Sequence, residues 1–144
     1  MDFVLCERMG KQGHFFGRLP DHCRLGEILE RYPDYRTAYM GKWHLGDEIF
    51  AQHGFEEWVS IEYYDNYYSE GSDLSKKPDY HYFLLDKGYK PDRGEHFSRA
   101  FATRRPLEHC KPKFLEMRAC EFLRRNRNEP FILYINFLEP HMPF

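Results

Sequence analysis

No stretch of the chain is apolar over the length that a transmembrane helix requires. The first residues also lack the basic start and the long apolar segment of a secretory signal, so we expect no signal peptide in this sequence. A large excess of charge of one sign is also missing, because 21 basic and 23 acidic residues leave a formal net charge of −2. This balance gives no reason to expect a nucleic acid or a membrane as a partner.

Cysteines are few, and their spacing argues against a cysteine-based metal site. The four cysteines include no Cys-x-x-Cys pair. Cys110 and Cys120 lie near the two ends of one predicted helix, about 15 Å apart along its axis. A disulfide needs Cα atoms within about 7 Å, so these two cannot pair with each other. Cys6 and Cys23 could pair, but nothing in the sequence decides it, and the cellular compartment stays open.

A phosphate-binding loop of the nucleotide-binding type is also absent. That loop needs a glycine upstream of Gly-Lys and a serine or threonine after it. Around Gly41 and Lys42, these two positions hold Arg36 and Trp43. The Gly-Lys pair therefore needs another explanation.

The chain is organised around residues 41–46, Gly-Lys-Trp-His-Leu-Gly. Residues 35–40 before them alternate β-branched and aromatic side chains, which predicts a strand. Ligands of parallel α/β sheets bind beyond the carboxyl ends of the strands. Lys42 and His44 would then meet an anionic substrate as a cation and a proton carrier. Taken singly, each is as well explained as a solvated or capping residue.

A second block lies near the end of the chain. Residues 131–137 are nearly continuous in apolar side chains, which predicts a central strand covered on both faces. The sequence Pro-His-Met-Pro-Phe follows at 140–144, and its prolines hold this loop extended. His141 would therefore lie past the end of a buried strand, either as a site residue or as a structural histidine.

These blocks carry a family resemblance. Residues 35–46 resemble the second signature of the sulfatases, the formylglycine-dependent hydrolases of sulfate esters. Residues 53–55, His-Gly-Phe, resemble a tripeptide that often follows it, and residues 130–144 resemble the buried strand and Pro-His-x-Pro loop of the family. The resemblance implies an α/β fold of the alkaline-phosphatase-like type, with a largely parallel central sheet flanked by helices. It also implies hydrolysis of sulfate esters, with a small-molecule or glycan sulfate ester as the partner.

The resemblance further implies roles for individual residues. Lys42 would contact the sulfate and the formylglycine, and His44 would hold the formylglycine hydroxyl and assist sulfate release. His141 would lie beside the sulfate and the leaving-group oxygen. In this family the formylglycine is made from a cysteine or serine, beside a calcium ion bound by carboxylates. Lys42, His44 and His141 are thus the predicted catalytic residues, and Lys42 and His141 also the predicted substrate-binding ones.

The nucleophile signature itself is missing. It reads Cys or Ser, any residue, Pro or Ala, any residue, then Arg, whereas Cys110-Lys-Pro-Lys ends in Phe114. The acidic pair before the nucleophile and the Asp-Asn or Asp-His pair after His141 are also absent. We therefore interpret residues 1–144 as an incomplete part of one sulfatase catalytic domain. We expect the formylglycine upstream, the calcium ligands outside this chain, and no metal held by these residues.

Two alternatives stay open. A phosphonate or phosphate ester hydrolase of the same superfamily would keep the fold and change the substrate. A non-catalytic truncated relative would use aromatic residues to hold a glycan. Residues of about 61–92 form a predicted loop-rich insertion, in which four tyrosines alternate with acidic residues. It could face a substrate or pack as a surface loop on its own domain.

Further elements follow from periodicity. We expect a helix over about 24–31, a short strand at 57–60 and a helix around residues 97–101. Asp79 should cap another helix, ended by Gly88. Its apolar face should hold Tyr82, Phe83 and Leu85. A longer helix should begin near Pro112. One face of that helix should hold the side chains of Leu115, Ala119, Phe122 and Leu123.

Overall fold

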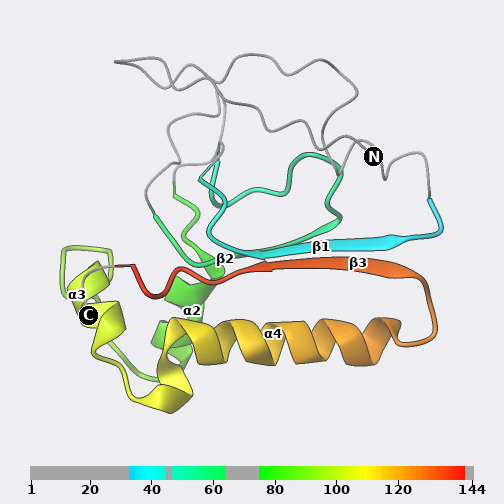
Figure 1. Ribbon diagram of the computed structural model, residues 1–144. Helices are drawn as coiled ribbons and strands as arrows, with labels where there is room; N and C mark the ends of the chain where they lie inside the picture. Colours follow the sequence, from blue (N-terminus) through cyan, green and yellow to red (C-terminus); the bar gives the residue numbers. More distant parts are fainter. Residues whose placement is uncertain (1–32, 45–46, 64–74, 142–144) are drawn as a thin grey trace.

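The computed structural model describes residues 33–44, 47–63 and 75–141. In these ranges the chain forms a three-stranded parallel sheet with helices, so the predicted α/β class is confirmed (Figure 1). The strands are β1 (Arg36–Gly41), β2 (Glu57–Ser60) and β3 (Phe131–Asn136). The helices are α2 (Asp79–Asp86), α3 (Arg99–Thr103), the 3-10 turn η2 (Leu107–His109) and α4 (Lys111–Asn126). The helix expected over 24–31 and most of the tyrosine-rich loop lie outside the described residues.

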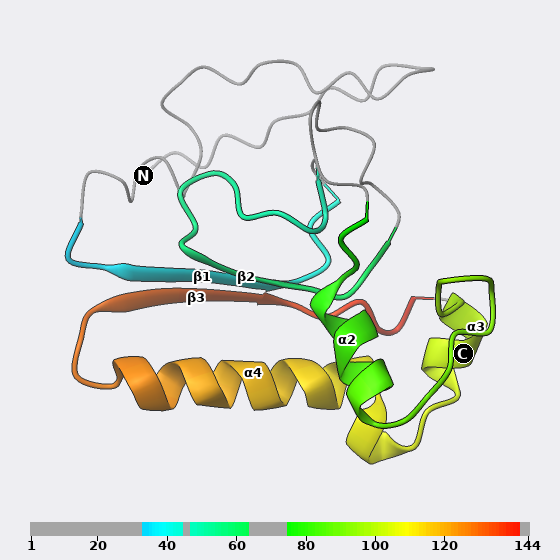
Figure 2. The same ribbon diagram turned by 180° about the vertical axis from the view of Figure 1, so that it is seen from behind.

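All three strands point the same way, in the order β2-β1-β3. Arg36 of β1 pairs with Phe131 of β3, and Gly41 pairs with Asn136. Because the pairing is parallel, the loops that leave the strands start from one edge of the sheet. The two views show α3 beyond this edge, with residues 137–141 leading toward it (Figures 1 and 2). The two motif-bearing strands thus lie parallel in one sheet, in agreement with the largely parallel sheet that the family resemblance implies.

The prediction that residues 131–137 form the central strand covered on both faces is wrong for the part of the chain described. The central strand is β1, and β3 lies at an edge of the sheet. Leu133 and Ile135 pack against the core, whereas Phe131 and Tyr134 are 37% and 48% exposed. A continuous apolar run does not distinguish a strand covered on both faces from one whose second face stays partly open.

One face of the sheet is covered by α4, which runs along the strands (Figures 1 and 2). Ala38 and Met40 of β1 are fully buried in the same core as Leu115, Ala119 and Phe122 of α4. The helix starts with a proline in its first turn, as expected. Leu123, which we expected on the buried face, is 40% exposed. No helix in the described residues has the length and apolar character needed to cross a membrane.

The apolar face predicted for α2 is wrong for two of its three residues, because only Phe83 packs against the core. Tyr82 and Leu85 are 49% and 43% exposed, and the helix instead buries Tyr80, His81 and Leu84. Both sets recur at helical spacing, so periodicity alone does not choose between them. The choice comes from the neighbouring elements that pack against the helix.

The start of α2 also differs from the prediction. Asp79 is the first residue of the helix rather than its cap, a position that Pro78 holds. Its carboxylate accepts hydrogen bonds from both the backbone N–H and the hydroxyl of Ser60, each at 2.8 Å. Ser60 ends β2, so these bonds attach the helix to the strand. This attachment fixes which face of α2 turns inward.

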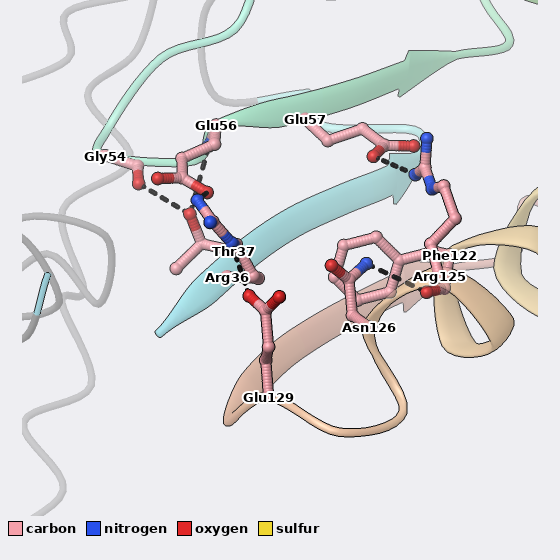
Figure 3. Close-up of polar contacts among 9 residues, drawn as sticks. All are labelled: Arg36, Thr37, Gly54, Glu56, Glu57, Phe122, Arg125, Asn126 and Glu129. Carbon is pink, nitrogen blue, oxygen red and sulfur yellow. Dashed lines mark hydrogen bonds and ion pairs between the residues drawn. The ribbon is translucent and has the colours of Figure 1, made fainter. Parts of the chain in front are cut away.

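The amino-terminal edge of the sheet is held by polar contacts far from the motif loops (Figure 3). Arg36 forms ion pairs with Glu129 at 2.8 Å and with Glu56 at 3.8 Å. Thr37 Oγ1 donates to the carbonyl of Gly54 and accepts from the N–H of Glu56, both at 3.0 Å. The ion pairs are exposed and contribute little to stability. Thr37 is buried, and it fixes the chain that leads into β2.

Candidate functional site

The predicted site residues all follow strands that end at one edge of the sheet. Lys42 and His44 follow β1, and His141 follows β3. The Lys42 N–H donates to the carbonyl of Asn136, the last residue of β3, at 3.3 Å. The two motif loops therefore begin side by side. His44 and His141 are placed at this edge by the strands they follow, and both are exposed.

Two side chains hold the backbone carbonyl of Lys42. The Asn136 side-chain amide donates to it at 2.6 Å, and the Tyr39 hydroxyl donates to the same oxygen. Burial raises the pKa of Tyr39, so its phenol stays protonated and available as a donor at neutral pH. Asn136 was not among the site residues predicted from the sequence. Its signal was present, because it is a lone amide at the end of an otherwise apolar strand.

Aromatic packing holds Trp43 between the two predicted site residues. Its ring meets those of Tyr39 at 4.8 Å, Trp58 at 5.4 Å and His53 at 5.4 Å. Tyr39 itself stacks on Trp58, with ring centroids 4.6 Å apart. These contacts lie on the sheet face opposite α4, because Tyr39 alternates with the core residues of β1. Phe55 joins this aromatic group, which is how the His-Gly-Phe tripeptide meets the motif.

The backbone at His44 is held in an unusual conformation by Glu48. His44 has φ of 59°, a left-handed value that few non-glycine residues adopt. Its N–H donates to Glu48 Oε1 at 2.7 Å, and the N–H of Trp43 donates to Oε2 at 2.8 Å. The Glu48 side chain is fully buried. No sequence pattern indicated this role for Glu48, since an acidic residue four positions after a histidine is ordinary.

The described part of the His141 loop, residues 137–141, turns directly after β3. The N–H of His141 donates to the carbonyl of Leu138 at 3.1 Å, which closes a tight turn just after β3. Its imidazole is exposed. An exposed imidazole can neutralise an anion or transfer a proton to a leaving group.

A buried ion network follows β2 at the same edge. The Glu62 carboxylate is 1% exposed and pairs with Lys111, the first residue of α4, and with Arg99 of α3 at 3.0 Å. Burial alone would raise the pKa of Glu62. The charges and hydrogen bonds of Lys111 and Arg99 outweigh this effect and leave the pKa below its ordinary value. The network joins the end of β2 to both helices.

Tyr63 comes next and makes a hydrogen-bonded pair with a buried histidine. Its hydroxyl lies 2.7 Å from His81 Nδ1 and accepts the N–H of Phe97 at 3.2 Å. With Phe97 as its donor, the hydroxyl can give its own proton to His81. Burial raises the pKa of Tyr63 to about 12, and burial and the charge of Lys77 lower the pKa of His81. Both shifts favour the neutral forms, which suits a hydrogen-bonded pair in a buried position.

The described residues at this edge form no cluster of metal-ligating side chains. Within residues 33–44, 47–63 and 75–141, no three His, Cys, Asp or Glu side chains lie close enough to hold a metal ion. A hollow of about 710 Å³ lies between α2 and α4, lined among others by Tyr82, Lys113 and Arg124. Lys42, His44 and His141 do not line it. The three predicted residues follow strands at the sheet edge and lie apart from this hollow.

Comparison with known proteins identifies the family. No curated protein and no solved structure matched the chain. The family model described as Sulfatase matches residues 9–144, which include both motif loops and all three strands. The chain therefore belongs to the sulfatase family.

Proposed function

We propose that this chain supplies the anion-binding and proton-transfer residues for the hydrolysis of sulfate esters, as an incomplete part of a sulfatase catalytic domain. The observation that carries the proposal is the joining of the two motif loops at one sheet edge, through the bond between Lys42 and Asn136. Family membership supports an ester hydrolase of the sulfatase type. The substrate would be a small-molecule or glycan sulfate ester.

Each proposed role answers a chemical need of the reaction. Cleavage of a sulfate ester requires that negative charge on the sulfuryl oxygens be neutralised, which suits the Lys42 amine. The departing alkoxide needs a proton, and an imidazole with a pKa near 6.5 can deliver one at neutral pH. We assign this proton transfer to His141. We assign orientation of the nucleophile and release of sulfate to His44.

The formylglycine that the family resemblance implies would supply the attacking oxygen. Its signature does not occur in residues 1–144, so we place it elsewhere in the catalytic domain. Calcium, also implied by the resemblance, needs about six or more oxygen ligands. The described residues hold no cluster that fits a metal ion, so we assign calcium no ligand and no step in this chain.

Steady-state hydrolysis of an activated aryl sulfate tests the proposal. The assay compares the 144-residue chain with a protein that also carries the missing nucleophile signature. We expect turnover only from the second protein, and a large loss when its Lys42 or His141 is replaced by alanine. Lys90→Ala is the matched control, because Lys90 is an exposed lysine outside the motif loops.

The same assay separates the alternatives. Preferential turnover of an aryl phosphate would favour the phosphate ester hydrolase. No turnover of either ester by the complete domain, together with glycan binding, would favour the non-catalytic relative. Full activity after Lys42→Ala would contradict the assigned role of the motif.

A further inference from the structure

We infer that Glu48 is a positioning residue, which holds the backbone of Trp43 and His44 so that Lys42 and His44 can meet an anion together. This inference rests on the proposed function, because it concerns the same site. It assigns to a buried carboxylate a task that the motif residues cannot perform for themselves.

The Glu48 carboxylate accepts hydrogen bonds from two consecutive backbone amides. Each of its oxygens accepts one backbone N–H, from His44 at 2.7 Å and from Trp43 at 2.8 Å. Two consecutive amides are therefore aimed at one rigid group, which fixes the orientation of the peptide planes on both sides of Trp43. Hydrogen bonds to an ionised acceptor are stronger than neutral ones.

The burial of Glu48 also supports this role. The Glu48 side chain is fully shielded from solvent, so its charge must be compensated within the protein. The two amides supply part of that compensation. Occupancy of both bonds and the backbone conformation of Trp43 and His44 are therefore coupled.

The bonds to Glu48 maintain an unusual backbone conformation at His44. His44 adopts φ of 59°, which a non-glycine residue keeps only when its surroundings enforce it. Freed from Glu48, the peptide would relax toward more populated values. The His44 imidazole would then move relative to the Lys42 amine.

Glu48 is itself anchored to β2 through its backbone. Its carbonyl accepts the indole N–H of Trp58 in β2 at 2.9 Å. The preceding Asp47 is buried, and its carboxylate accepts the N–H of Ile49 at 2.8 Å. Glu48 therefore links β2 to the loop after β1, so the position of this loop depends on both β1 and β2.

The test uses the ¹⁵N-labelled 144-residue chain and two carboxylate-to-amide variants. Glu48→Gln keeps the shape but places an NH₂ group against one of the two amides. Asp79→Asn is the matched control, because Asp79 also accepts a backbone N–H, that of Ser60, but outside the motif loop. Two quantities are measured: amide hydrogen exchange at Trp43 and His44, and the affinity for inorganic sulfate from chemical-shift titration.

We expect Glu48→Gln to speed exchange at Trp43 and His44 by at least about tenfold, since bonds to a charged acceptor are worth that factor or more. Sulfate affinity should fall severalfold. Asp79→Asn should speed exchange at Ser60 and leave sulfate affinity unchanged. Equal effects of both variants on sulfate, or unchanged exchange in Glu48→Gln, would overturn the inference.

Should Glu48→Gln fail to fold, Glu48→Asp takes its place. It keeps the charge but withdraws the carboxylate by one methylene, so it should loosen the same two amides while the chain stays folded. Loosened amides with unchanged sulfate affinity would also overturn the inference. A wild-type chain that binds no sulfate would count against the proposed function, and the exchange rates would still decide whether Glu48 holds the loop.

Discussion

Replacing Gly41 by alanine should disrupt the site by forcing β1 and β3 apart. Gly41 ends β1 with φ of 125°, a region that L-residues rarely enter. A Cβ there would lie 2.8 Å from the carbonyl carbon of Asn136 and closer still to its oxygen. That carbonyl accepts the N–H of Lys42. The substitution should therefore disrupt the hydrogen bond between Lys42 and Asn136, which joins the two motif loops.

The magnitude follows from three contributions. Forcing a non-glycine residue into a sparsely populated conformation costs about 1–3 kcal/mol. Inserting a methyl group where backbone atoms must move costs about 1–3 kcal/mol more. Loss of the bond between Lys42 and Asn136 adds about 0.5–1.5 kcal/mol. We expect the free energy of unfolding to fall by at least about 2.5 kcal/mol, a large share of the roughly 5–15 kcal/mol typical of a domain.

Two other glycines separate the steric effect from the conformational one. Gly88 and Gly94 have φ of 81° and 60°, but an added Cβ would meet nothing within 4 Å at either. Alanine there should cost only about 1–2 kcal/mol, for the left-handed conformation. Urea unfolding would be followed by the fluorescence of Trp43 and Trp58, both of which pack on Tyr39. A loss at Gly41 no larger than the loss at Gly88 would refute the reasoning.

Three further predictions concern the site and its surroundings. In the complete domain, Lys42→Ala and His141→Ala should each lower kcat/KM for an aryl sulfate by at least about a hundredfold. This is the scale of one lost electrostatic or proton-transfer contribution. A near-normal rate would mean that the motif has a structural role. Because the pKa of Glu62 is lowered in the folded state, its stabilising contribution should be present above about pH 4.5 and be lost as the pH falls through the folded pKa. Glu62→Gln should therefore be less stable at pH 7 and should flatten the acid side of the stability curve measured by urea unfolding, while an unchanged pH slope would contradict the role of the network. Calorimetry should show no tight, stoichiometric calcium binding to residues 1–144, and such binding would overturn the expectation that the ligands lie elsewhere.

The strands and their direction were predictable because they depend on local patterns. The alternation at residues 35–40 and the apolar run at 131–137 marked β1 and β3 to within a residue at each end. Their common direction followed from the polar loop after each strand, whereas their direct pairing came from the structure. The helix after Cys110 was equally accessible, because Pro112 in the first turn and an apolar stripe are both local signals.

Which face of an element is buried was less accessible. In α2 two apolar stripes compete, and the bonds between Asp79 and Ser60 select Tyr80 and Leu84. In β3 the apolar run indicated cover on both faces, yet Tyr134 is half exposed. Both outcomes depend on which neighbour packs against the element, and periodicity carries no information about neighbours.

The sequence by itself determined the chemistry available at the sheet edge, because a lysine and two histidines follow two recognisable strands. Only the tertiary structure identified the residues that hold this chemistry in place. Asn136 and Glu48 act through backbone atoms of residues 42–44, and such bonds leave no pattern along the chain. Their role follows from the pairing of β1 with β3 and from the burial of a carboxylate, which are properties of the folded chain.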